Sequence, residues 1–114
     1  MIKKIIYIWF SMLFSVNVLA HASLQTSNIV EGAVLIEVPD KLDLAFSGNV
    51  GLAALSIQDS SGKKVGAQSP LPRTLQKQFS IPLPDLNSGA YKIEWKTMSS
   101  DGHIMSGHIN FTVK

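Results

Sequence analysis

Apolar and polar residues alternate with a period close to two over much of the chain. Leu42, Leu44 and Phe46 are separated by single residues. Successive side chains of a β-strand point to opposite faces, so this pattern predicts strands with one buried face, and the helical period of 3.6 residues is not evident. Other segments with the strand pattern are 55–58, 79–83, 91–95 and 109–113.

Short segments rich in glycine, proline, serine, asparagine and aspartate separate these strands. They occur at 31–32, 39–40, 47–49, 59–62, 70–72, 87–89 and 101–102. About seven short strands with a turn every 8–12 residues are typical of an immunoglobulin-like sandwich. We therefore predict an all-β fold, a seven-stranded immunoglobulin-like Greek-key β-sandwich. Pro82 and Pro84 fall within one predicted strand, which places that strand at a sheet edge or ends it early.

The first 20 residues have a different pattern, typical of a secretory signal peptide. Lys3 and Lys4 form a short positive segment, an apolar run follows from residue 5 to about residue 19, and Ala20 ends it with a small side chain. Polar residues interrupt the run, and a membrane-spanning helix needs about 20 apolar residues, so a cleaved signal is favoured over a retained anchor. We expect a signal peptide over 1–20, cleavage after Ala20, export to the periplasm, and one domain over 21–114 without a membrane span.

Removal of this segment makes the net charge zero. The chain has 10 Lys and Arg residues and 8 Asp and Glu residues; Lys3 and Lys4 precede residue 21 and every acidic residue follows it, which leaves eight of each sign. Without a strong basic patch, nucleic acid is excluded as a partner. The chain has no cysteine, so thiolate metal sites and disulfide chemistry are excluded as well.

Two groups of candidate metal ligands lie at opposite ends of 21–114. Cleavage after Ala20 gives His21 a free α-amine, which can close a chelate ring on a metal ion together with the Nδ1 of the same residue; Cu(II) suits such nitrogen-rich sites best. Asp101 and His103 are two residues apart, so extended backbone directs both to one face, and Gly102 allows a close bend around an ion. The other interpretation is an ordinary Asp-Gly turn beside a surface histidine.

Several short motifs, in this order and spacing, resemble the CopC family of periplasmic copper-binding proteins over essentially the whole chain after residue 20. They are His21-Ala22-Ser23-Leu24, 39–42, Leu44-Ala45-Phe46-Ser47, 89–95, Ser100-Asp101-Gly102-His103 and 107–113. The resemblance implies a β-sandwich that holds one Cu(II) per chain through the amine and imidazole of His21 with Asp101 and His103. It also implies a partner, an inner-membrane copper-transport protein.

Two departures make the chain similar to the Cu(II)-only branch of that family. Some members carry a methionine-rich loop that binds Cu(I), whereas the segment after residue 20 has only Met98 and Met105. Some members have a glutamate after the Phe-Ser pair, where this chain has glycine and asparagine. That position cannot supply a carboxylate, so any oxygen ligand must come from Asp101 or water.

Four other residues have structural interpretations. His108 falls on the polar register of the last predicted strand, so we expect an exposed histidine that binds no metal. Trp95 shares the register of Ile93 and is expected in the core. Met98 and Met105 are expected to pack rather than bind, because methionine fills irregular apolar gaps.

Copper capture, buffering or delivery without turnover is the function that these residues favour, so we do not expect an enzyme. Lytic polysaccharide monooxygenases are similar locally, because they hold copper with an N-terminal histidine on a β-sandwich. The 94 residues after residue 20 leave little room for a polysaccharide-binding face, and Asp101 would occupy a position that oxygen activation needs. A third interpretation is a structural sandwich module without a metal.

Overall fold

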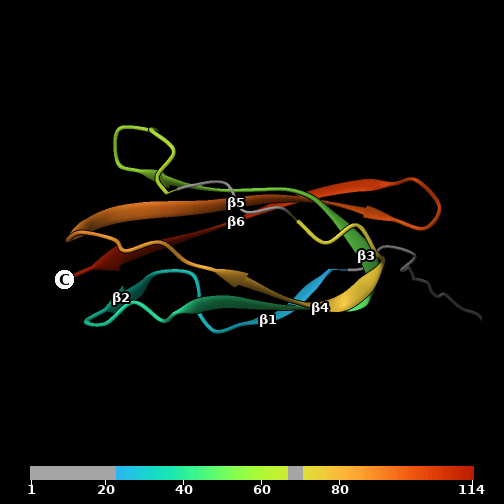
Figure 1. The fold of residues 1–114 in the computed structure, drawn as a ribbon, viewed down its shortest axis with the longest axis horizontal. Coiled ribbons are helices and arrows are strands. Elements are labelled where there is room, and N and C mark those ends of the chain that lie inside the picture. Colours follow the sequence, from blue (N-terminus) through green and yellow to red (C-terminus); the bar gives the residue numbers. More distant parts are fainter. Residues whose placement is uncertain (1–22, 67–70) are drawn as a thin grey trace, which may run out of the picture.

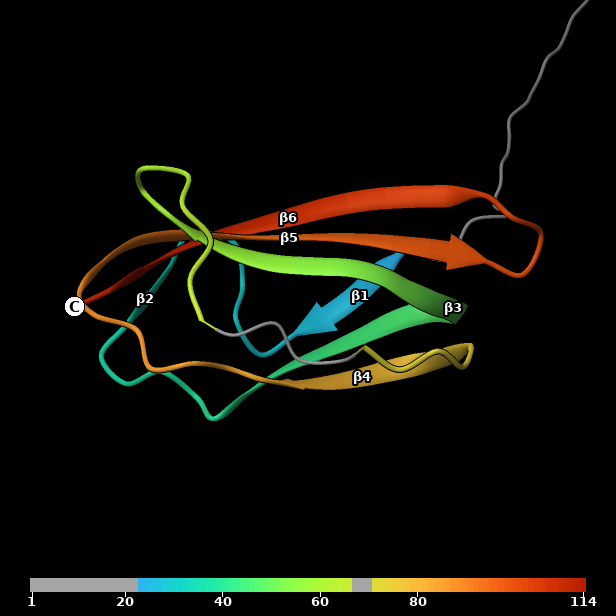
Figure 2. The same ribbon diagram turned by 45° about the horizontal axis from the view of Figure 1, so that its top comes forward.

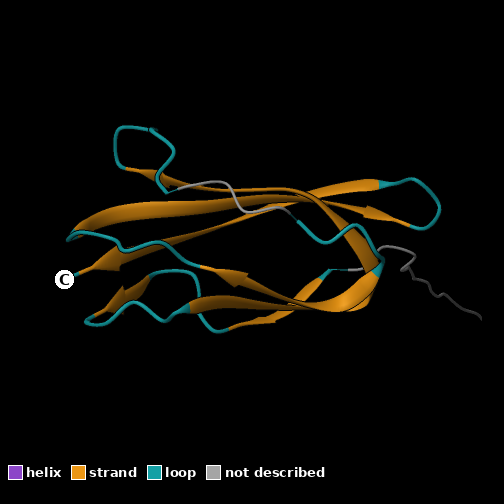
Figure 3. Cartoon of the chain, in the orientation of Figure 1, coloured by secondary structure: helices purple, strands orange, loops and turns teal. Residues whose placement is uncertain are grey.

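The computed structural model describes residues 23–66 and 71–114, and within these ranges the chain forms six β-strands and no helix (Figure 3). The all-β prediction is confirmed. The predicted signal peptide, its cleavage site and His21 lie outside the described residues. The described part of the chain contains no helix that is long and apolar enough to cross a membrane. The strands are β1 (Leu24–Ser27), β2 (Ala33–Leu35), β3 (Lys41–Asp59), β4 (Gln76–Pro82), β5 (Gly89–Ser99) and β6 (Ile104–Val113).

The long strand β3 runs through both layers of a sandwich (Figures 1 and 2). Residues 41–46 of β3 pair with β1 and β4, and residues 50–59 pair with β5. β5 pairs in turn with β6, and β6 pairs with β2 in parallel. One layer therefore holds β1, β4 and the first half of β3, and the other holds the second half of β3 with β5 and β6.

The prediction of a turn at residues 47–49 is wrong, because β3 continues through these residues. The register of β3 against β4 shifts between Ala45 and Val50, so the strand bends from one layer to the other without ending. Extra residues in one strand of a pair increase its twist locally and bend it, and a glycine favours this. The continuous strand also accounts for the strand count, which is six within the described ranges where the sequence pattern predicts seven.

Three local predictions are confirmed. β4 ends at Pro82 and, among the described strands, pairs only with β3, as the two prolines predict for an edge strand. Turns follow β3 at residues 60–62 and β5 at residues 100–102. Lys63 and Lys64, beside the first of these turns, are exposed.

The alternation along the strands determines which side chains form the core. Leu42, Leu44 and Phe46 of β3 have exposed fractions of 0%, 1% and 3%. Ile93 and Trp95 of β5 are 0% and 7% exposed, which confirms the prediction for Trp95. Burial of one such aliphatic side chain contributes about 1.5–3 kcal/mol. Apolar contacts between the layers therefore hold the sandwich together and leave the strand ends and turns to carry polar chemistry.

Trp95 packs against Gly107, its register partner on β6. A Cβ at residue 107 would lie 2.3 Å from the Cζ2 of the indole, closer than real Cβ atoms approach a neighbour. Glycine at this position therefore lets the indole lie directly against the backbone of β6. This contact fixes the β5–β6 ladder, whose far end carries the candidate ligands.

Candidate metal centre

Asp101 and His103 lie at the turn between β5 and β6, at one end of the molecule (Figure 1). The N–H of Ser99 donates to the carbonyl of His103 at 2.9 Å, and the N–H of Gly102 donates to the carbonyl of Ser99 at 3.0 Å. Gly102 has a φ of +89°. This is the arrangement of a three-residue hairpin loop whose third residue is left-handed, the conformation that glycine adopts at least cost.

The turn brings the two predicted ligand side chains together. The Nδ1 of His103 lies 2.8 Å from the Oδ2 of Asp101, and the two side chains are 60% and 51% exposed. A carboxylate only accepts hydrogen bonds, so Nδ1 carries the proton of this bond. The other ring nitrogen, Nε2, then faces away from the carboxylate. An exposed imidazole and an exposed carboxylate held in contact form a pair of donors that a metal ion can share.

Ser99 contacts the same carboxylate, a role that the sequence analysis missed. The Ser99 hydroxyl donates to the Oδ1 of Asp101, which also accepts the backbone N–H of His103 at 3.2 Å. The bond from Ser99 has the largest effect on the pKa of Asp101, followed by the backbone and ring bonds from His103. Together they lower this pKa from 3.8 to about 2. Asp101 is therefore ionised throughout the neutral range. The signal in the sequence was a serine two residues before an aspartate in a tight turn, where side chains of these types bond locally.

The described chain begins towards the same end of the molecule (Figures 1 and 2). The N–H of Ser23 donates to the hydroxyl of Ser47 at 2.9 Å, and the N–H of Ser47 donates to the carbonyl of Ser23 at 2.8 Å. Val50, three residues further along β3, is the register partner of Ser99. The start of β1 and the β5–β6 turn are therefore both attached to the bend of β3.

Asp101 and His103 are two donors, and a metal site needs more. Within residues 23–66 and 71–114 no group of three or more His, Asp and Glu side chains lies close enough to hold a metal ion. His21, the third predicted ligand, precedes the described residues, so its role stays a prediction.

The other histidine and the two methionines lie elsewhere on these strands. His108 is exposed, as predicted, and lies opposite Glu94 in the β5–β6 register. Met105 is half-buried and fits the expected packing role, whereas Met98 is 41% exposed and does not. The alternation of β5 gives the reason, since Thr97 is buried and the next residue must point outward.

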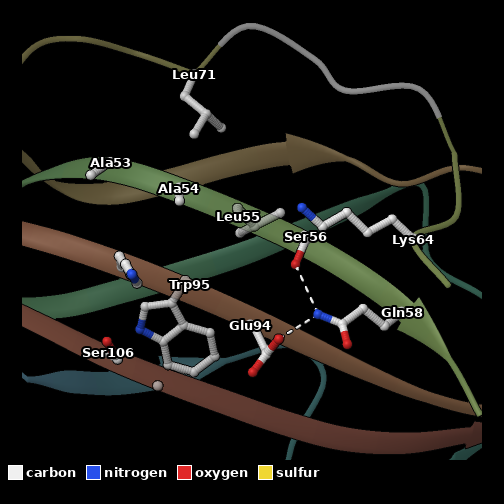
Figure 4. A pocket seen from close by; sticks show the side chains of 12 residues that line it. Ala53, Ala54, Leu55, Ser56, Gln58, Lys64, Leu71, Glu94, Trp95 and Ser106 are labelled. Atoms are coloured by element: carbon white, nitrogen blue, oxygen red, sulfur yellow. Dashed lines mark hydrogen bonds between the residues drawn. The ribbon is translucent and has the colours of Figure 1, made fainter. Parts of the chain in front are cut away.

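Side chains of β3, β5 and β6 line a groove on the sheet (Figure 4). The side-chain amide of Gln58 donates to the carboxylate of Glu94 and, at 3.4 Å, to the hydroxyl of Ser56. Polar side chains in the groove thus bond to one another, and neither Asp101 nor His103 lines it. The groove is therefore separate from the candidate metal centre.

Comparisons with known proteins find relatives along nearly the whole described chain. Residues 24–114 match the CopC domain family. Copper resistance protein C of Pseudomonas syringae pv. tomato is 32% identical and aligns with 90% of this chain and 88% of its own length. Protein YobA of Escherichia coli (strain K12) is 33% identical, and the alignment covers 86% of this chain and 82% of YobA. The crystal structure of CopC from Methylosinus trichosporium OB3b superposes with a TM-score of 0.68 at 32% identity, over 82% of this chain and 94% of that one.

Proposed function

The chain belongs to the CopC family, and on that premise we propose that it is a periplasmic protein that binds Cu(II) and captures, buffers or delivers it without turnover. One Cu(II) per chain is held by the amine and Nδ1 of His21, by the carboxylate of Asp101 and by the imidazole of His103. Copper is the cargo, and an inner-membrane copper-transport protein is the proposed partner. The name of the Pseudomonas syringae relative, a copper resistance protein, supports this choice of metal.

The contact between Asp101 and His103 is the observation that carries the proposal. It supplies an oxygen and a nitrogen donor at an exposed end of the sandwich. His21 is two residues before Ser23, and two residues of extended chain span at most about 7 Å. Because Ser23 is bonded to Ser47 near the bend of β3, this length limits how far from the bend the proposed amine of His21 can be.

The hydrogen bonds of the turn support a choice of donor atoms. Nδ1 of His103 donates to Asp101, so we assign Nε2 as the nitrogen that binds copper, in keeping with histidine ligands that donate their other ring N–H to a carboxylate. From the described residues, the carboxylate of Asp101 accepts three hydrogen bonds. An ionised carboxylate has about four acceptor sites. One site therefore remains for the metal.

The proposed donor set favours Cu(II) over Cu(I). Amine and imidazole nitrogens with a carboxylate oxygen suit Cu(II), whereas Cu(I) prefers thiolate and thioether sulfur. The chain has no cysteine, and Met98 and Met105 are its two methionines after residue 20. Reduction of the bound ion should therefore weaken its binding.

Blocking the amino terminus is the experiment that tests the proposal. Protein recovered from the periplasm should have the mass of residues 21–114 and should bind one Cu(II) in a competition titration. A variant with one alanine inserted before His21 should lose more than about 100-fold in affinity, which is the upper end of what loss of an outer-shell partner costs. Retention of residues 1–20 in the native protein, or equal affinity with the amine blocked, would overturn the proposal.

A further inference from the structure

Ser99 is placed by its backbone to act on Asp101. Both of its backbone polar groups bond within the turn, the N–H to the carbonyl of His103 and the carbonyl to the N–H of Gly102. Ser99 is half-buried as the last residue of β5, so its Cβ has a fixed position relative to the loop. From there its hydroxyl reaches the Oδ1 of Asp101 and lies 3.3 Å from the carbonyl of His103.

Asp101 needs such a partner. Its side chain is half-exposed in the middle of a three-residue loop, where a carboxylate without partners would sample several rotamers. The Ser99 hydroxyl and the His103 N–H both bind Oδ1, and together they set the plane of the carboxyl group. In that plane Oδ2 faces the Nδ1 of His103.

We propose that Ser99 is a positioning residue of the copper site: its hydroxyl holds Oδ1 of Asp101, so that the carboxylate and the ring of His103 are oriented before the ion arrives. The inference rests on the proposed function and adds a residue to it that does not touch the metal. Loss of such outer-shell partners lowers metal affinity by about 10–100-fold in known sites. The effect expected at Ser99 lies in that range.

The chain contains its own control for this hydrogen bond. In the turn that follows β3, the hydroxyl of Ser61 donates to the Oδ1 of Asp59 at 2.6 Å. That turn has a lysine, Lys63, in the position that His103 occupies in the other turn. Ser61→Ala therefore removes the same kind of bond from the same kind of turn, away from the proposed ligands.

The experiment compares Ser99→Ala, Ser99→Thr and Ser61→Ala in protein that begins at His21. Cu(II) affinity is measured by competition at one pH, and the copper coordination by electron paramagnetic resonance. Ser99→Ala should bind about 10–100-fold more weakly with a changed spectrum. Ser99→Thr keeps the hydroxyl and should restore affinity to within about threefold of the wild type. Ser61→Ala should leave affinity within about twofold, because distant sites act independently.

A second pair of variants distinguishes weaker binding caused by unfolding of the hairpin from weaker binding caused by misorientation of Asp101. Ser99→Val and Ser99→Thr have similar shapes and both suit a strand, and they differ in the hydroxyl. Weaker copper binding by the valine variant alone, at equal thermal stability, supports the proposal. Wild-type affinity in Ser99→Ala, or equal losses in Ser99→Ala and Ser61→Ala, would overturn it. Failure of the wild-type protein to bind Cu(II) would instead overturn the proposed function.

Discussion

The turn of residues 59–63 and the turn of residues 99–103 have the same backbone and different chemistry. In each turn, the N–H of the first residue donates to the carbonyl of the fifth residue at 2.9 Å. The N–H of the fourth residue donates to the carbonyl of the first, at 2.9 Å in the turn of residues 59–63 and at 3.0 Å in the turn of residues 99–103. The fourth residue is a left-handed glycine, with φ of +85° at Gly62 and +89° at Gly102. The two turns lie at opposite ends of the β3–β5 ladder.

The side chains of the first and third positions are exchanged between these turns. Asp59 is first in its turn, and its Oδ1 accepts bonds from the N–H and hydroxyl of Ser61 and from the N–H of Lys63. Asp101 is third in its turn, and its two oxygens are divided between the hydroxyl of Ser99 and the backbone and ring of His103. The carboxylate in the first position, Asp59, accepts bonds only from the backbone and the serine of its own turn among those described. The carboxylate in the third position, Asp101, also contacts the side chain of the fifth residue. The fifth residue then decides whether an imidazole nitrogen lies beside the carboxylate.

Exchange of that fifth residue should have the largest effect. His103→Lys places in the second turn the residue that the first turn has, so the fold should be kept and the imidazole donor lost. We expect Cu(II) affinity to fall by more than about 100-fold, beyond what an outer-shell change costs. Competition titration measures the loss, and thermal unfolding of the metal-free protein checks the fold.

The reverse exchange is the control for this prediction. Lys63→His should add no second tight copper site, because Asp59 is bonded back to its own turn. In addition, Ser23, where the described chain begins, is bonded to Ser47 beyond the other end of the β3–β5 ladder. An electron paramagnetic resonance spectrum that is unchanged in His103→Lys would show that His103 is not a ligand. A second equivalent of tightly bound copper in Lys63→His would show that the turn alone is enough.

Acidification should release copper while both turns stay intact. Free α-amines have a pKa of about 7.7–8.0 and ordinary imidazoles about 6.5, so protons compete with copper for nitrogen and affinity should fall below about pH 6. Hydrogen bonds from Ser99 and His103 lower the pKa of Asp101 from 3.8 to about 2, and bonds from Ser61 and Lys63 lower the pKa of Asp59. A lowered carboxylate pKa stabilises the fold above the unfolded value of 3.8, and for Asp101 this contribution is lost as the pH falls through about 2.

Copper titrations between pH 8 and pH 4, with backbone NMR spectra of the metal-free protein over the same range, test this separation. The midpoint of copper release should lie well above any change in the resonances of the two turns. Asp101→Asn should lower affinity by the same factor at each pH, so the slope of log affinity against pH stays unchanged while release moves to a higher pH. A slope that changes with this substitution would show that Asp101 takes up a proton that releases copper.

The alternation of apolar and polar residues along the strands predicted much of this fold. Where the residue types suit two local structures equally well, the prediction failed. The apolar positions of β3, β4, β5 and β6 follow from a period of two, because one face of each strand must be buried. Residues 47–49 misled the prediction, since serine, glycine and asparagine favour a turn and a bulged bend alike. Which of the two forms depends on partners across the sheet, such as the Ser23 that binds Ser47.

The candidate site was predictable in part for a similar reason. The spacing of Asp101 and His103 on extended backbone predicted both side chains on one face; the structure brings them into contact through a tight turn instead. Ser99 was not singled out, because Ser-Ser-Asp-Gly at 99–102 and Asp-Ser-Ser-Gly at 59–62 have the same composition. Only the geometry of the turn shows which hydroxyl reaches which carboxylate.

The two glycines of the turns give a smaller and more closely matched test. Apart from the adjacent residues, no heavy atom of the described chain lies within 4 Å of a Cβ built on Gly62 or Gly102, so an alanine at either site meets backbone strain and no clash. Each substitution should cost about 1–2 kcal/mol of unfolding free energy, measured with urea. Gly102→Ala should also weaken copper binding, since it moves Asp101 relative to His103, and Gly62→Ala should not. Equal effects on copper would mean that the two turns do not differ in function.

Substitution of the histidine outside both turns should have the smallest effect. His108 is exposed on β6 opposite Glu94. Hydrogen bonds from Asn110 lower the pKa of Glu31, and the attraction of His108 adds only a small contribution to this shift. His108→Ala should change the unfolding free energy by no more than about 0.5 kcal/mol, as is usual for surface sites. Copper affinity should stay within about twofold, because the residue is distant from the turn. A loss as large as that of His103→Lys would show that the imidazole ligand comes from the face of β6 and that the Asp-Gly-His turn, like the turn after β3, serves the fold alone.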